Sequence, residues 1–553
     1  MPLAVLTFQF STALGWALLL VVVAWSVRTA KEPDAGTGPG WKWWALTAAA
    51  LLCFRWPMLW VQHQLNPDES QLIAGAITLR HDPVFWRSVD GSTAGPLDYY
   101  PLLPAAWADG VASYAVARLI ALAAVFGAVV FAGETLALLA GAALARIAVL
   151  PALAAIAFTT SPDLAHYSSE LMPVLLLAAA GYAAVRQARA PAPRWVWLVA
   201  VLLGCMPWAK LQAAPFAGVM WLLVAVAERR AGRTRSLLPL VAGALLPALL
   251  LFAITALAGQ TEHLVTPYLI QNLAYVGAPQ FTWVQDAAGQ WQNALSDGYL
   301  GFWLAGAALC LVPLALWHTR TAPAASRRVA LTAALLFAVG LYSTLAPRRP
   351  STHHLQFLPL PLLWLSGAVL ALAWPRADAP GSAGKRLRLA GCFLLCALGP
   401  QLAWRIGGLD SYAAINAAGI SPARRELADL VRTYSARGEP LAIWGWRCSL
   451  YVEAGRPQAT RQAQSELQIL AGPHQPYFLR RYFEDFQAAN PPVFADAVGP
   501  GNFAFEQRSL AHECFPPLRD AVRTRYTLVA NLDGTRLYVR NDRLPATHPA
   551  AAP

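Results

Sequence analysis

Charged residues are scarce in this chain. Asp, Glu, Lys and Arg make up 13% of its 553 residues, whereas soluble globular proteins carry about 25%. Hydrophobic residues reach 57%, and the deficit of charge is concentrated in long apolar runs before residue 405. The composition therefore excludes an ordinary soluble protein and predicts a polytopic α-helical membrane protein.

Negative charge is the scarcer sign, with 30 acidic residues against 42 Lys and Arg and a net charge of +12. The basic residues gather in alternate loops, near residues 28–42, 146, 186–194, 229–235, 320–328 and 376–388. Short loops rich in Lys and Arg stay in the cytoplasm. We therefore attribute the positive charge to membrane orientation and not to a nucleic-acid partner, and this orientation places the N-terminus outside.

About twelve apolar runs are long enough to cross a bilayer, which takes about 20 residues each. They predict a transmembrane domain over 1–405, with long outer loops at 63–112 and 259–298. The first run lacks the basic leader and cleavage site of a signal peptide, so we interpret it as a retained helix. Runs 148–162 and 195–228 also suit re-entrant helices. The expected spans are 4–27, 41–62, 113–140, 148–162, 168–185, 195–211, 212–228, 236–258, 299–317, 329–346, 354–374 and 388–405.

Cysteine spacing typical of a metal site is also missing. Most of the seven cysteines lie in or beside apolar runs, where packing explains them. Cys448 and Cys514 lie in the polar C-terminal part, and one disulfide between them is an open alternative if that part is extracytoplasmic.

After residue 405 the apolar runs stop, and we expect an extracytoplasmic α/β domain over 406–545. Segments 439–446, 492–497 and 526–540 have strand patterns, and Asp533-Gly534 is a hairpin turn signal in the last of them. Segments 422–434 and 477–487 have helical patterns between them. The Ala- and Pro-rich tail 546–553 is predicted to be disordered.

Asp68 and Glu69 form the most informative pair in the chain, because ionisable groups at a membrane boundary are costly and are usually functional. They open the loop 63–112, which is too long for a simple connector. A helix over 70–79 is expected to share its apolar face with lipid or protein. The structural alternative is that both carboxylates only cap this helix, since acidic residues favour helix N-termini.

Three further polar clusters are predicted on the same outer side. His166 and Glu170 are spaced i, i+4, so on a helix they share a face; a structural hydrogen-bonded pair is the alternative. Cations at the outer face need a local reason, either an anionic ligand such as a phosphate or a salt bridge to a loop carboxylate. The three clusters contain Asp163, His166 and Glu170, then Lys210 and Gln212, and finally Arg348, Arg349, His353 and His354.

Together the clusters supply a carboxylate base and several cations. A base can deprotonate an acceptor hydroxyl or amine, and cations stabilise charge on a departing phosphate. A carboxylate beside another carboxylate tends to have a raised pKa, which suits acid–base work. Glycosyl transfer from a lipid phosphate needs these parts.

With these residues the chain resembles the GT-C fold glycosyltransferases that use polyprenyl-phosphate sugars, including protein O-mannosyltransferases and the lipid A aminoarabinose transferase. The resemblance covers the membrane domain, about three-quarters of the chain. It rests on the following motifs in this order: Asp68-Glu69, Gly95-Pro96-Leu97 with Tyr99-Tyr100, the segment 166–170, Lys210-Leu211-Gln212 and His353-His354-Leu355.

The resemblance implies a role for each cluster. Asp68 resembles the catalytic base, and Glu69 its substrate-contacting neighbour. The lipid-linked phosphate is expected to bind Lys210, Arg348, Arg349, His353 and His354, and the substrate to contact Tyr99, Tyr100, Asp163, His166, Glu170 and Gln212. The chain departs from the family where His353-His354-Leu355 replaces an expected His-Tyr-Leu, and where an extra helix precedes the catalytic loop.

We therefore expect an integral glycosyltransferase of the bacterial inner membrane, with its active site and C-terminal domain on the periplasmic side. Its partners would be the bilayer, a polyprenyl-phosphate-linked sugar, and a glycan, lipid or protein acceptor. No cofactor is required by the pattern, although Asp68, Glu69, Asp163 and His166 could supply oxygen and nitrogen ligands to a divalent metal. The alternatives are a transporter or flippase for a lipid-linked glycan, which would place polar groups near the midplane in repeated halves, and a non-enzymatic assembly protein.

Overall fold

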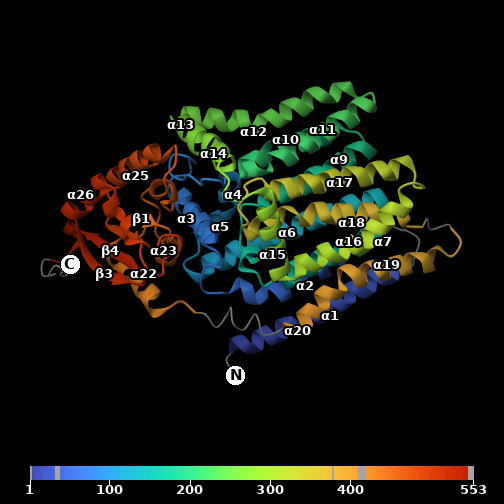
Figure 1. The fold of residues 1–553 in the computed structure, drawn as a ribbon, viewed down its shortest axis with the longest axis horizontal. Coiled ribbons are helices and arrows are strands. Elements are labelled where there is room, and N and C mark those ends of the chain that lie inside the picture. Colours follow the sequence, from blue (N-terminus) through green and yellow to red (C-terminus); the bar gives the residue numbers. More distant parts are fainter. Residues whose placement is uncertain (1–2, 32–37, 376–378, 409–418, 546–553) are drawn as a thin grey trace. The chain divides into compact units, whose positions relative to one another are not determined.

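The computed structural model describes residues 3–31, 38–375, 379–408 and 419–545 (Figure 1). The chain forms two compact units. Unit 1 comprises residues 1–58, 121–250 and 275–414, and unit 2 comprises residues 59–120, 251–274 and 415–553. The predicted disordered tail 546–553 lies outside the described residues.

Unit 1 is helical. Within the described ranges, eight helices are long and apolar enough to cross a membrane, or nine if the bent pair α19 and α20 is one span. The helices lying wholly or mainly in unit 1 are α1 (Leu3–Thr29), α2 (Trp41–Leu59), α6 (Val111–Ala140), α7 (Ala142–Phe158), α8 (Pro162–Ala165), α9 (Leu171–Arg189), α10 (Pro193–Ala209), α11 (Ala214–Arg230), α12 (Leu237–Leu257), α15 (Trp283–Asp297), α16 (Tyr299–His318), α17 (Ala324–Leu345), η5 (Thr352–Phe357), α18 (Pro359–Ala373), α19 (Ser382–Ala397) and α20 (Gly399–Gly407).

Each predicted span overlaps one of these helices or the bent pair, but within the described ranges eight or nine qualify as membrane spans where about twelve were expected. The runs 148–162 and 195–211 form the shorter apolar helices α7 and α10. Small residues let the helices approach closely: a Cβ at Gly306 of α16 would lie 1.9 Å from the carbonyl oxygen of Cys396 in α19. The multi-pass membrane character expected from the sequence is therefore matched by the helices of unit 1.

Unit 2 is built around a four-stranded sheet of order β1-β2-β4-β3, with β1 (Leu441–Gly445) parallel to β2 (Val493–Ala497) and the other pairs antiparallel. β3 (Tyr526–Leu532) and β4 (Thr535–Arg540) form the predicted hairpin. Both turn residues, Asp533 and Gly534, have positive φ, as a two-residue type I′ turn requires. The predicted C-terminal strands are confirmed.

Three separated stretches of sequence build unit 2. Its helices are α3 (Pro67–His81), α4 (Pro96–Tyr99), α5 (Leu103–Ala106), α13 (Thr261–Leu264), α14 (Gln271–Gly277, which ends in unit 1), α22 (Pro422–Tyr434), α23 (Ser449–Ala454), α24 (Glu466–Ile469), α25 (Gln475–Ala489) and α26 (Pro516–Arg525). Ala74 of α3 packs in one core with Leu441, Val493 and Val539 of the sheet. The apolar face of α3 is therefore covered by protein, one of the two coverings that the sequence left open.

The second core of unit 2 lies on the other face of the sheet, where Trp444 and Phe494 pack with Tyr482 and Phe486 of α25. Residues 441–445 and 493–497 are all buried, because side chains of successive strand residues point to opposite faces and both faces are covered. The thiols of Cys448 and Cys514 are both free, so the structure does not contain the disulfide that the sequence left open.

Candidate functional site

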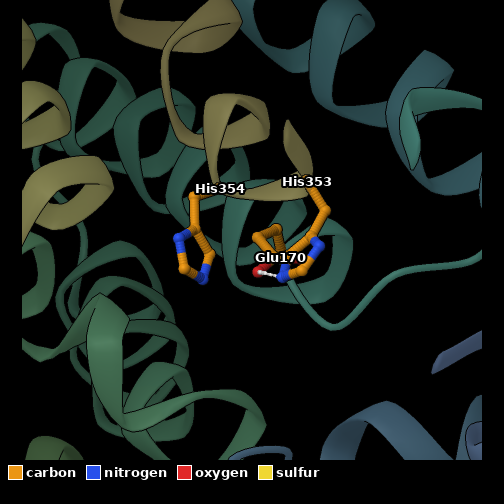
Figure 2. A group of neighbouring side chains, drawn as sticks. All are labelled: Glu170, His353 and His354. Atoms are coloured by element: carbon orange, nitrogen blue, oxygen red, sulfur yellow. Dashed lines mark ion pairs between the residues drawn. The ribbon is translucent and has the colours of Figure 1, made fainter. Parts of the chain in front are cut away.

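A cluster of basic side chains around one carboxylate, Glu170, lies in unit 1, and three of its members are drawn in Figure 2. The ammonium of Lys210 donates to a carboxylate oxygen of Glu170 and to the hydroxyl of Ser169, the latter at 2.8 Å. His353 Nε2 lies 4.0 Å from the same Glu170 oxygen, and the rings of His353 and His354 are 4.6 Å apart. The three predicted clusters thus each contribute a residue to one site.

Helix ends position these side chains. Glu170 is the residue before α9, Lys210 follows the end of α10 in an extended conformation, and both histidines lie in the 3₁₀ turn η5. α10 ends at Ala209, and the Lys210 N–H closes its last turn by donating to the carbonyl of Met206. The site is therefore made by chain breaks between apolar helices.

The electrostatics of the cluster favour an ionised Glu170. Burial alone would raise the pKa of Glu170, but Lys210 and the two histidines lower the pKa to about 2. One oxygen of Glu170, Oε2, is buried without a hydrogen-bond partner among the described residues, as is Nδ1 of His354. The ionised carboxylate binds the ammonium of Lys210. The two atoms without a partner in the described part of the chain, Glu170 Oε2 and His354 Nδ1, remain available to a ligand.

Glu170, His353 and His354 also have ligand atoms within 4.8 Å of one another, a set that a metal ion can use. The ammonium of Lys210 is in direct contact with the same carboxylate, and it would repel a divalent cation. Lys210 and the two imidazoles supply N–H donors, which suit an anionic ligand. The metal set named from the sequence, Asp68, Glu69, Asp163 and His166, does not recur among the ligand groups of the described residues.

Arg348 and Arg349 come just before η5 and carry no carboxylate partner among the described residues. The guanidinium of Arg349 lies 4.2 Å from the ring centre of Tyr275, and that of Arg348 lies 5.5 Å from Trp283. Arg348 has a φ of 50°, a strained value for a residue with a side chain. The salt-bridge alternative therefore applies to Lys210 but not to these two arginines.

His166 and Glu170 do not share a helix face, so that interpretation was wrong. His166 ends the short helix α8 in an extended conformation, and Glu170 precedes α9. The serines between them favour helix ends over helix interiors. Asp163 lies in the first turn of α8, where its carbonyl accepts from Gln356, and Gln212 donates to the carbonyl of Ser343 at 2.6 Å.

His166 faces a cavity of about 100 Å³ inside unit 1. Most of its lining is apolar and comes from α6, α7, α9 and α18, while Arg55, Asp297 and Gln356 add polar groups. Arg55 donates to the carbonyls of Thr159 and Ala165. Arg55 is therefore held inside the protein.

Asp68 and Glu69 lie in unit 2, at the start of α3. Asn66 caps this helix by accepting from the backbone N–H of Asp68 at 2.8 Å. The carboxylate of the half-buried Asp68 has no hydrogen-bond or ion-pair partner among the described residues. Glu69 is fully buried, and both of its oxygens accept from Arg118 at 2.8 and 2.9 Å. The two adjacent carboxylates therefore differ, because Glu69 is buried and bound by Arg118 whereas Asp68 is half-buried and not hydrogen-bonded within the described ranges.

Tyr99 and Tyr100, the predicted substrate contacts of the first loop, also lie in unit 2. The ring of Tyr99 is buried against α3, where a Cβ at Gly75 would lie 2.3 Å from it. Burial raises the pKa of Tyr99 well above its ordinary value. Tyr100 donates to the carbonyl of Pro83 at 2.7 Å. In this structure both tyrosines help to pack the loop, and substrate contact stays a prediction.

Arg118 and Ser169 are not among the residues predicted from the sequence. Arg118 is a charged residue inside the apolar run 113–140, a placement that is costly and usually functional, so the signal was present. Ser169 carried no signal of its own, because its contact with Lys210 depends on how α9 and α10 pack.

No protein-family profile and no curated protein matches the chain. Solved structures do match. ArnT from Cupriavidus metallidurans bound to undecaprenyl phosphate aligns with a TM-score of 0.59 at 11% identity, over 91% of this chain and 98% of ArnT. An Archaeoglobus fulgidus oligosaccharyltransferase in complex with zinc and sulfate aligns with a TM-score of 0.42 at 12% identity, over 82% of this chain and 68% of that one. At such identities the matches report on fold alone. On the ArnT match, the chain has the GT-C fold that the sequence predicts.

Proposed function

We propose that this protein is a membrane glycosyltransferase that moves a sugar from a polyprenyl phosphate to an acceptor at the outer face of the bacterial inner membrane. The observation that carries the proposal is the fold match with ArnT over nearly the whole of both chains. ArnT was solved with undecaprenyl phosphate, a ligand with an anionic head and an apolar tail. The acceptor is a glycolipid, a polysaccharide or a protein.

The cluster of basic side chains in unit 1 takes the donor phosphate in this proposal. When the bond between the sugar carbon and the phosphate oxygen breaks, the electron pair stays on the oxygen and the leaving phosphate gains charge. Lys210, His353 and His354 supply donors for that charge, with Glu170 holding the ammonium in place. Arg348 and Arg349 add cations that no carboxylate neutralises among the described residues.

Asp68 acts as the base in this proposal. It takes the proton from the acceptor hydroxyl or amine as the new bond to the sugar forms. Its half-buried carboxylate has no internal partner among the described residues, so it is available to an acceptor. Glu69 is less suited to this step because Arg118 occupies both of its oxygens.

The test is sugar transfer in membranes that contain wild-type protein, Asp68→Asn or Asp429→Asn, with a labelled polyprenyl-phosphate sugar pool. Asp429 is the matched control because its side chain is 68% exposed on α22. Asp68→Asn should lower transfer by about 10²-fold or more with unchanged insertion, while Asp429→Asn stays active. Full activity of Asp68→Asn would refute the base assignment, and absence of transfer by the wild type with every donor tried would favour the carrier alternative.

A further inference from the structure

Arg118 is an arginine buried inside an apolar helix. It lies in α6, and its side chain is 1% exposed. A buried charge is tolerated only when partners satisfy it. An arginine has five N–H donors in a planar fork, and five contacts use them. Nε and Nη2 donate to Glu69 at 2.8 and 2.9 Å, Nη1 to the carbonyls of Leu59 and Val61 at 3.4 and 2.7 Å, and Nη2 to the carbonyl of His63 at 2.6 Å.

These acceptors come from one short stretch of chain. Leu59 is the last residue of α2, and Glu69 lies in the first turn of α3, directly after Asp68. Between the two helices the backbone carbonyls have no helical partners of their own, so the guanidinium replaces them. Arg118 therefore fixes the path of residues 59–69 and the start of the helix that carries Asp68.

Tyr114, one helical turn before Arg118, adds a second attachment. Its hydroxyl lies 2.9 Å from the hydroxyl of Ser70, which donates to Gln64 at 2.6 Å. The Arg118 guanidinium lies 5.2 Å from the Tyr114 ring centre. Residues at i and i+4 share a helix face, so one face of α6 holds both Glu69 and Ser70.

We propose that Arg118 is a positioning residue for the catalytic base, and that Glu69 serves as its anchor and not as a group that touches substrate. This inference rests on the proposed function. The Asp68 side chain makes no hydrogen bond or ion pair among the described residues, so its place depends largely on its neighbours in sequence. Glu69 is held through both oxygens and Asp68 is held through its backbone N–H, which leaves the Asp68 carboxylate free to act.

The geometry requires arginine at this position. Lysine has three donors on one nitrogen, so it can satisfy Glu69 or the carbonyls but not the whole set. An Arg118→Lys variant keeps the positive charge but loses the planar guanidinium with its five N–H donors. The expected defect is a base held less firmly, which lowers kcat, while the KM for the lipid-linked donor changes little because other residues bind its phosphate.

The experiment is a double-mutant cycle on the full-length protein with Arg118→Gln, Glu69→Gln and the double variant, each measured for kcat and donor KM. Two groups that act as one unit are not additive. Arg118→Gln should lower kcat at least tenfold with donor KM within about twofold, and adding Glu69→Gln should cause no further loss. A double variant whose loss equals the product of both single losses would overturn the proposal, because Glu69 would then act on its own.

Hydrogen exchange gives a readout that does not need turnover. In Arg118→Lys, amide exchange should quicken in residues 59–70, while exchange in β1 and β2 and the thermal midpoint stay near wild type. Unchanged exchange in residues 59–70 would overturn the proposal even if no sugar transfer is found. If the wild type transfers sugar and Arg118→Lys matches its kcat, the positioning role fails while the proposed function stands.

Discussion

Lys210 and Glu170 depend on each other for burial. Their side chains are 5% and 0% exposed, and neither charge is stable alone in such surroundings. The pair thus supports the fold and, in the proposed function, also presents an ammonium to the donor phosphate. A loss of activity after mutation of either residue is therefore ambiguous unless stability is measured as well.

Replacing Lys210 separates these two roles. Lys210→Met leaves the Glu170 carboxylate buried and unpaired, so we expect the protein to lose about 3–5 kcal/mol of stability. The double variant Glu170→Gln with Lys210→Met should regain most of this stability, because buried pairs can be replaced together at little cost. Sugar transfer should stay low in both. Thermal unfolding in detergent and transfer assays measure the two effects; a double variant that transfers normally would contradict the phosphate role of Lys210.

His263 makes the stability of unit 2 depend on pH. Arg461 donates to its Nε2 at 2.9 Å, so the ring is neutral and its Nδ1 donates to Tyr477 at 2.7 Å. Burial, followed by the charges of Arg461 and Arg481, lowers the pKa of His263 from 6.5 to about 4, although Asp90 acts in the opposite direction.

The sign of this effect follows from proton binding. Between pH 6.5 and about 4 the unfolded chain binds a proton at His263 that the folded protein does not, so stability falls as the pH falls. The thermal midpoint of the wild type should therefore drop more over this range than that of His263→Gln. Equal drops in the two proteins would show that His263 does not contribute to the acid sensitivity.

The site was partly predictable from single residues. Charges near apolar runs pointed to Asp68, Glu170, Lys210 and His353, because such charges are costly wherever the chain folds. Their partners were not predictable. The contact of Glu69 with Arg118 joins residues far apart in sequence, and no local pattern encodes it. The prediction that His166 and Glu170 share a helix face was wrong, because residue spacing alone does not say where a helix ends.

Among the elements, α3 depends strongly on its neighbours, because nearly all of its middle is buried. Gly75 leaves room for the Tyr99 ring, since a Cβ there would lie 2.3 Å from it. The ring is fixed within the same unit, so it cannot move aside without disturbing the loop.

Gly75→Ala should therefore destabilise unit 2, although alanine is the better helix former by about 1 kcal/mol. The control is Gly218→Ala in α11, where a Cβ meets nothing within 4 Å and stability should be unchanged or slightly higher. Thermal unfolding and sugar transfer should both fall in the first variant only. A Gly75→Ala protein as stable as the control would mean that Tyr99 packs less tightly against α3 than the structure indicates.

The elements themselves were largely predictable. Long apolar runs gave the helices of unit 1, and Asp533-Gly534 gave the β3–β4 hairpin, because both signals are local in sequence. The grouping of these elements into two units could not be predicted from the sequence. Ala74 packs with Val493 and Val539, and Asp90 pairs with Arg481 at 2.5 Å. Contacts between residues so far apart in sequence leave no periodic pattern in the sequence.

At the scale of the whole molecule, unit 2 should unfold as one body. Leu537→Ala removes a fully buried side chain from the core that contains Ala74, a change that costs about 2–5 kcal/mol. Amide exchange should therefore quicken in α3 as well as in β4. The control Leu470→Ala removes a side chain that is 48% exposed and should change neither. Faster exchange confined to the sheet would show that α3 is stable without it.

The interleaved order of unit 2 has a consequence for biosynthesis. Chains fold from their N-terminal end as they are made, yet the core around α3 includes Val539 of the last strand. The segment bearing Asp68 is synthesised long before β4 and obtains its final packing only after β4 has been made. A ribosome that stops before β4 therefore releases a product with most of its membrane helices but an unfinished segment around Asp68. Under the proposed function, we expect such incomplete chains to be unable to act on the lipid-linked sugar.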